Sequence, residues 1–127
     1  MNQLRPRTAS PEHDPALLAY LKCHVTSFTR WDVLRLLVHF GERWTDVHEA
    51  ARVLHKSEPT IEATLRELVE EGLVEAGPSR FGVRAYRMSP LEPSTLVAER
   101  LVQAAQRSHE LRELIVARIL GAARIAS

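Results

Sequence analysis

Apolar residues recur at helical spacing along several stretches of the chain, and the clearest of these stretches covers residues 57–71. Ser57 is a suitable N-cap there, and Pro59 lies in the first turn, where its missing N–H removes no intrahelical hydrogen bond. Gly72 marks the end of the helix. The apolar stripe of this helix consists of Ile61, Leu65 and Leu68.

A β-hairpin is predicted directly after this helix. Residues 73–76 start a strand, residues 77–82 read as a turn, and residues 83–88 alternate as a return strand. Upstream, Thr45 is expected to cap a short helix that ends before the tight connection 55–57. Helix, short turn, helix and hairpin is the order of a winged helix-turn-helix.

The run SEPTIEATLRELVEEGLVEAGPSRFGVRAYRMSP resembles the recognition helix and wing of MarR-, ArsR- and TrmB-like transcription regulators. The resemblance covers roughly residues 27–90. It implies that helix 57–71 enters the major groove of duplex DNA and that the 77–82 loop reaches the backbone or the minor groove. Winged helices also dock proteins, so the resemblance is more specific for the fold than for the function.

Further helices are predicted on both sides of this unit. Asp14, followed by Pro15, starts an amphipathic helix that runs to about Val25, and residues 1–13 are expected to be a mobile tail. Residues 29–40 form the next helix, with Gly41 at its end. Trp44 is expected to lie in a short strand that pairs with the wing, with its ring closing the core.

After the wing, Ser94 is expected to cap one continuous helix that reaches about Leu120. Such a helix is roughly 40 Å long, more than one small domain can cover. Its apolar stripe is therefore predicted to form the interface of a symmetric homodimer, with folding back over its own core as the alternative. The predicted interface residues are Leu101, Ala104, Leu111 and Ile115.

The predicted fold is mainly α with a small β-hairpin wing: a winged helix-turn-helix flanked by an N-terminal helix and a long C-terminal dimerisation helix. The 127 residues divide into a tail (1–13), the N-terminal helix with the winged unit (14–90) and the dimerisation helix (91–127). No apolar run is long enough for a membrane span, and the N-terminus does not resemble a secretory signal. The single cysteine, Cys23, is expected to be a buried thiol in a cytoplasmic protein.

Charge does not point directly to a polyanionic partner. The formal net charge is +1, and residues 29–90 carry nine Lys/Arg and ten Asp/Glu. Helix 57–71 alone has five glutamates and one arginine. Glu67, Glu70 and Glu71 are expected to lie away from any groove and to pair with arginines of neighbouring elements. DNA binding would therefore depend on how the cations are distributed and would be salt-sensitive.

The candidate DNA-binding residues gather on the exposed face of helix 57–71, in the turn before it and along the wing. Arg66 suits a guanine or a phosphate, Glu62 suits a cytosine amino group, and Thr60 suits a phosphate or a thymine methyl. The cations of the turn and the wing suit the DNA backbone. The full set is Lys56, Thr60, Glu62, Arg66, Arg80 and Arg84.

Two other functions stay open. The alternative to DNA binding is that the acidic helix docks a protein partner. Phe81 at the wing tip is expected either to contact a base or a protein partner or, as we favour, to fold back onto the hairpin. A small-ligand site at the junction of the terminal helices is a further possibility, but no residue set specifies it. The six histidines form no metal motif, and the sequence indicates no catalytic set, phosphate loop or cofactor.

Overall fold

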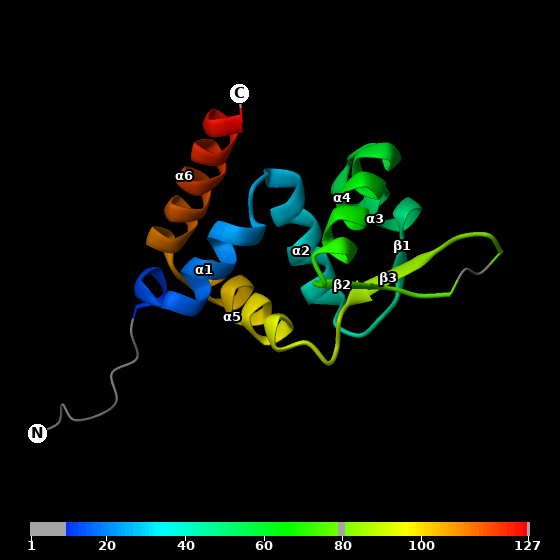
Figure 1. Ribbon diagram of the computed structural model, residues 1–127, viewed down its shortest axis with the longest axis horizontal. Coiled ribbons are helices and arrows are strands. Elements are labelled where there is room, and N and C mark those ends of the chain that lie inside the picture. Colours follow the sequence, from blue (N-terminus) through cyan, green and yellow to red (C-terminus); the bar gives the residue numbers. More distant parts are fainter. Residues whose placement is uncertain (1–9, 79–80, 127) are drawn as a thin grey trace, which may run out of the picture.

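The computed structural model of the chain describes residues 10–78 and 81–126, the last four of them by backbone alone. Within these ranges the fold is mainly helical, with a small antiparallel sheet, as predicted (Figure 1). Buried side chains of α1, α2, α3, α4, the sheet, α5 and α6 form one hydrophobic cluster. The elements are η2 (Pro11–His13), α1 (Pro15–His24), α2 (Phe28–Phe40), β1 (Thr45–Asp46), α3 (Val47–Leu54), α4 (Glu58–Glu70), β2 (Val74–Ala76), β3 (Ala85–Met88), α5 (Pro93–Arg107) and α6 (His109–Ala126).

The predicted winged unit is present and consists of α2, α3, α4 and the sheet. The strand order is β1-β3-β2, with Thr45 opposite Tyr86 and Val74 opposite Met88. The β2–β3 hairpin projects away from the helices and forms the wing (Figure 1). Because β1 pairs with the return strand of the hairpin, the wing is attached directly to the chain segment that enters α3.

The start of α3 differs from the prediction by one residue. Thr45 is not its cap, since it lies in β1 with its side chain buried. The cap is Asp46, whose carboxylate accepts a hydrogen bond from the backbone N–H of Glu49 at 2.8 Å. A short carboxylate at this position also interacts favourably with the positive end of the helix dipole.

The N-terminal region also departs from the prediction in two places. Asp14 caps α1 as expected, with Ala16 N–H 2.9 Å from its carboxylate. The expected tail is wrong for Pro11–His13, which form a 3-10 helix packed against α1 and α6, and residues 1–9 lie outside the described ranges. Cys23 is exposed on α1 and not buried.

The prediction of a single C-terminal helix is wrong, because Ser108 interrupts the helix and separates α5 from α6. Ser108 is extended (φ −110°, ψ 113°), and its hydroxyl accepts a hydrogen bond from Leu111 N–H at 3.0 Å, which caps α6. Arg112 donates to the Ala105 carbonyl at 2.8 Å and so satisfies the end of α5. At the other end, Glu92 and not Ser94 occupies the N-cap of α5, with Pro93 following it.

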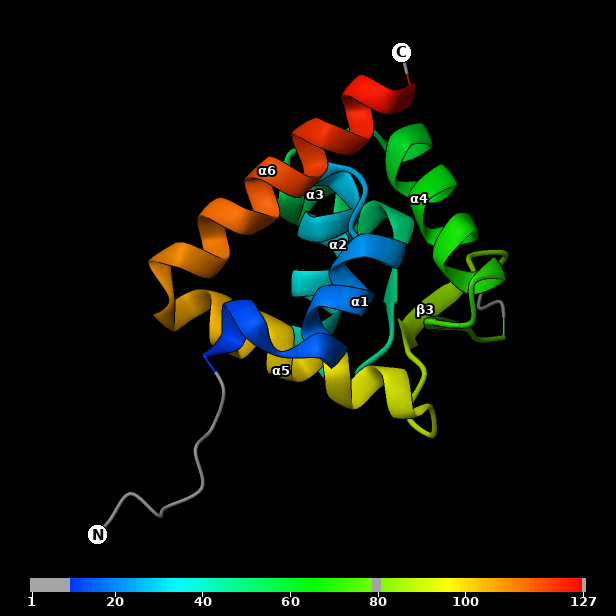
Figure 2. The same cartoon turned by 60° about the vertical axis from the view of Figure 1, so that its left-hand side comes forward.

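This break removes the stripe that was expected to hold a partner chain. Figure 2 shows α5 and α6 meeting at a corner and lying against α1 and α2. Leu101, Leu111 and Ile115 are 1%, 0% and 2% exposed, and Ala104 is half-buried against the same core. These side chains stabilise their own chain, which was the alternative interpretation. A homodimer stays a prediction, and it would need another surface.

Candidate nucleic-acid interface

The connection between α3 and α4 is tight because one residue reverses the chain. His55 adopts the left-handed conformation (φ 57°, ψ 46°) at the end of α3, and Lys56 N–H bonds back to the Ala51 carbonyl at 3.0 Å. Ser57 then caps α4, as predicted, by accepting from the Thr60 N–H at 3.3 Å. These local interactions fix the angle at which α4 leaves the turn.

The two faces of α4 are divided as the sequence predicted. The inner face is buried against the core and consists of Ile61, Thr64, Leu65 and Leu68. Thr60, Glu62, Ala63 and Arg66 lie on the outer, exposed face. The outer face is the surface that a helix of this fold would present to a partner.

A hollow of about 640 Å³ separates the outer face of α4 from the wing, and we call it the α4–wing hollow. It brings Glu62 and Arg66 of α4 together with Arg84 of the wing, which are three of the six predicted DNA-binding residues. Lys56 lies in the turn and Thr60 borders a separate hollow, so neither lines this one. Arg80 lies outside the described residues.

Most cations around this surface have a carboxylate within pairing distance. Arg66 lies 3.5 Å from Glu62, one turn away on the same helix. Lys56 lies 3.8 Å from Asp32 of α2. Arg84 is exposed, and no carboxylate among the described residues pairs with it. The surface is therefore of mixed charge, with its uncompensated positive charge on the wing.

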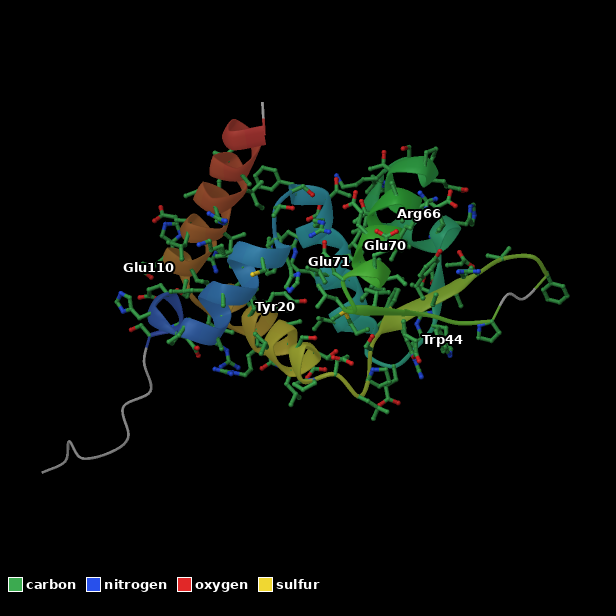
Figure 3. The ribbon with its side chains drawn as sticks, viewed as in Figure 1. Tyr20, Trp44, Arg66, Glu70, Glu71 and Glu110 are labelled. Carbon is green, nitrogen blue, oxygen red and sulfur yellow. The ribbon has the colours of Figure 1, made fainter. Side chains whose placement is uncertain are left out.

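Two of the three glutamates near the end of α4, Glu67 and Glu71, pair with an arginine of a neighbouring helix as predicted, whereas Glu70 is exposed and has no ion-pair partner among the described residues. The guanidinium of Arg30, on α2, is buried and lies 3.3 Å from Glu67, and it also donates to both oxygens of Glu71. His24, at the end of α1, completes the cluster with its ring 2.9 Å from Glu71. Figure 3 shows Glu71 on the side of α4 toward α1 and α2.

This cluster shifts the pKa of both partners toward the charged form. Burial by itself lowers the pKa of Arg30, but the hydrogen bonds and the charges of Glu71 and Glu67 outweigh it and raise the pKa. Burial likewise acts to raise the pKa of Glu71, but the hydrogen bonds from Arg30 and His24 lower it overall. The cluster therefore joins α2 to the end of α4 through the ionised Arg30–Glu71 pair, and α1 through the ring and the carbonyl of His24.

Two aromatic side chains do not lie where the sequence predicted. Trp44 does not close the core: it is 36% exposed, and its ring packs on Gly77 with the Arg87 guanidinium 4.2 Å from the ring centroid. Phe81 does not fold back onto the hairpin, since it is 97% exposed. Phe81 and Gly82 both have positive φ (52° and 78°), and this turn conformation points the ring into solvent.

The sequence prediction missed a second group of polar side chains near the start of α4. Hydroxyls from the segment that enters α2 and from α4 border a hollow of about 590 Å³. Hydroxyls of this kind suit phosphate oxygens. The signal in the sequence is the run of hydroxyl residues before the apolar helix 29–40, a pattern that also marks the start of a helix. The hydroxyl residues of this hollow are Thr26, Ser27, Thr29, Thr60 and Thr64.

Within the described residues, no three His, Cys, Asp or Glu side chains are grouped as ligands for a metal ion. The histidines that contact acids do so in pairs, as His48 does with Glu58 at 2.8 Å and His109 with Glu113 at 3.1 Å. In the same ranges, no helix is long and apolar enough to cross a membrane.

Comparison with solved structures identifies a protein of the same fold. The crystal structure of AntR, an antimony-specific transcriptional repressor, matches with a TM-score of 0.59 and 18% sequence identity. The match covers 90% of this chain and 96% of that chain. No protein-family model and no curated protein sequence matches. The likeness to AntR extends over the flanking helices as well as the winged unit, and at this identity it shows the fold alone.

Proposed function

We propose that this protein binds duplex DNA through α4 and the wing and acts as a transcription regulator. The observation that carries the proposal is that the outer face of α4 and the wing border one hollow, with Arg66 on one side and Arg84 on the other. A helix presented in this way enters the major groove in DNA-binding winged helices. The fold shared with AntR supports the same function, and the proposal gives the chain no catalytic step.

Each candidate residue has a role that follows from its place. Arg66 reaches a base edge or a phosphate once it releases Glu62, and the freed Glu62 carboxylate accepts from a cytosine amino group. Thr60 and the hydroxyls at the start of α2 bind the phosphates beside the groove. Arg84, on the wing, binds the DNA backbone, and so does Lys56, in the turn before α4. Arg80, which lies outside the described residues, keeps the role that the sequence predicts for it, contact with the DNA backbone or a narrow minor groove.

The pairing of the cations sets the expected strength of binding. If Lys56, Arg66 and Arg84 each neutralise one phosphate, log K should fall with log salt at a slope of about −2.7 per chain. Before they bind phosphate, Arg66 must release Glu62 and Lys56 must release Asp32. Because these pairs are lost on binding, the expected affinity for DNA is modest. Sequence preference then depends on Arg66 and Glu62.

Fluorescence anisotropy of a labelled mixed-sequence duplex tests the proposal at about 50 mM and about 200 mM salt. Arg84→Gln should weaken binding to all sequences and reduce the salt slope by about one. The matched control is Arg107→Gln, which removes the same charge from an exposed position on α5, outside the α4–wing hollow. Arg66→Ala should weaken binding and also relax selectivity among duplexes. Equal losses for Arg84→Gln and Arg107→Gln would show attraction to net charge and would reject this interface.

The opposing result has a defined meaning. If wild-type protein does not bind any duplex at low salt, the paired Arg66 and the exposed acids of α4 describe a protein-docking face instead. Exposed Phe81 would then be its apolar anchor.

We further propose that regulation is by repression, with the dimer placing two α4 helices one DNA turn, about 34 Å, apart. Sedimentation equilibrium tests this dimer, and a single-chain mass at all concentrations would reject it.

A further inference from the structure

A hollow of about 600 Å³ lies between α2, α5 and α6 and shares no lining residue with the α4–wing hollow; we call it the α2–α5–α6 hollow. Its volume is within the range of small-molecule sites in proteins. Its apolar wall includes Trp31 and Phe28, and Phe28 is 44% exposed on α2. Val102 of α5 and Val116 of α6 continue this wall. A large apolar side chain that stays half-exposed beside a hollow offers a contact surface for a flat apolar group.

The charge of the lining distinguishes this hollow from the others. Its charged or titratable lining residues are Arg35, His39 and Arg112, and none of its lining residues is a carboxylate. Four other hollows of the described residues each include at least one glutamate in their lining. Size alone does not separate them, since the α4–wing hollow is about 640 Å³. The absence of acids therefore points to a ligand with negative charge.

The two arginines differ in how much of their charge is available. Arg35 donates to Asp32 at 2.8 Å, and its guanidinium lies 5.6 Å from the Trp31 ring centroid. Arg112 uses one nitrogen, Nη1, to bond the carbonyls of Ala105 at 2.8 Å and Gln106 at 3.3 Å. No carboxylate among the described residues pairs with Arg112, and its other nitrogens make no hydrogen bond there. A guanidinium held in place by carbonyls, with N–H groups to spare, suits a carboxylate.

We propose that the α2–α5–α6 hollow binds a small aromatic carboxylate, with its ring against Trp31 and Phe28 and its charged group on Arg112. The corner between α5 and α6 fixes the guanidinium, because Arg112 caps the carbonyls at the end of α5. This site is separate from the α4–wing hollow, so it does not depend on whether the protein binds DNA.

Titration with 2-naphthoate, followed by the indole N–H signals in a proton–nitrogen NMR spectrum, tests the site directly. The chain has two tryptophans, and only Trp31 lines this hollow, so Trp44 is an internal reference. The Trp31 signal should shift and saturate while the Trp44 signal stays in place. The neutral isostere 2-naphthamide should bind about tenfold more weakly or worse, because it offers no charge to Arg112.

Variants separate a charge-recognising site from an apolar surface. Arg112→Gln should abolish the preference for 2-naphthoate over 2-naphthamide, and Arg107→Gln, on exposed α5 surface outside the hollow, should keep it. Since Arg112 also caps α5, Gln106→Glu is a second variant that leaves this cap in place. It adds a carboxylate to the lining, and it should weaken 2-naphthoate about tenfold with little effect on 2-naphthamide.

Three results would overturn the proposal. In the first, neither probe moves the Trp31 signal at millimolar concentration. In the second, 2-naphthoate and 2-naphthamide bind equally, which would show apolar contact without recognition of charge. In the third, the chain sediments as a dimer that Gln106→Glu dissociates and the probes do not bind, which would assign the hollow to a second copy of the chain.

Discussion

Replacing Glu71 by Gln tests whether the ionised cluster behind α4 holds this helix in place. Breaking a buried ion pair costs about 3–5 kcal/mol when a charge is left without a partner. Here the Glu71 side chain is 33% exposed, and Arg30 keeps Glu67 and the His24 carbonyl as partners. Solvent screening and these remaining contacts reduce the expected loss to about 1–3 kcal/mol of unfolding free energy.

The neighbouring residue provides a matched control. Glu70 lies next to Glu71, is exposed, and has no ion-pair partner among the described residues (Figure 3). Glu70→Gln makes the same chemical change and should alter stability by less than about 0.5 kcal/mol. Urea unfolding followed by circular dichroism measures both variants. Equal stability of the two variants would refute the argument that the Arg30 cluster stabilises the packing of α4.

The same cluster predicts how the difference depends on pH. The pKa of Glu71 is lowered in the folded state, so the folded chain binds a proton at this carboxylate more weakly than the unfolded chain does. The stability from this group is therefore complete above the ordinary value of 4.5 and is lost as the pH falls through the lower folded value. The advantage of wild type over Glu71→Gln should be full at neutral pH and should shrink in acid. A difference that grew in acid would contradict this sign.

Four further substitutions test the packing, each by urea unfolding. Ser57→Ala removes the α4 cap and should cost about 1 kcal/mol, whereas Ser94→Ala should change little, because Ser94 is not the cap of α5. Gly77→Ala would place a Cβ 2.6 Å from the Trp44 ring, so the ring must move off the wing at a cost of about 1–3 kcal/mol. Leu111→Glu should unfold the chain, at more than about 4 kcal/mol, since Leu111 is 0% exposed. A folded Leu111→Glu variant that only lost a partner chain would contradict the observed burial.

The sequence predicted the winged unit well where local signals agreed with one another. The cap at Ser57, the proline in the first turn and the glycine at position 72 bound α4 to within one residue of its observed ends. The apolar period also assigned the inner and outer faces of α4 correctly. These features depend on contacts within about one helical turn, and such contacts can be inferred from spacing alone.

The errors that concern the terminal helices, Trp44 and the available charge came from contacts between residues distant in sequence. The apolar period continues through Ser108, so the pattern alone predicted one helix. The packing of α6 onto the rest of the chain stabilises the break, together with the Ser108 cap and the Arg112 hydrogen bonds. The same packing buries Leu111, which the sequence assigned to a dimer. Trp44 contacts Gly77 and Arg87, which are more than thirty residues away in the sequence, and Lys56 pairs with Asp32 on α2. The charge available for DNA therefore could not be read from composition.

The central claim is that α4 and the wing contact duplex DNA. The most direct measurement is a map of amide signals in a proton–nitrogen NMR spectrum as a short duplex is added at low salt. The account predicts shifts concentrated in residues 57–66 and 82–86, with the signals of α1 and α6 unchanged. Shifts on α1 or α6, or no shifts at all, would contradict it.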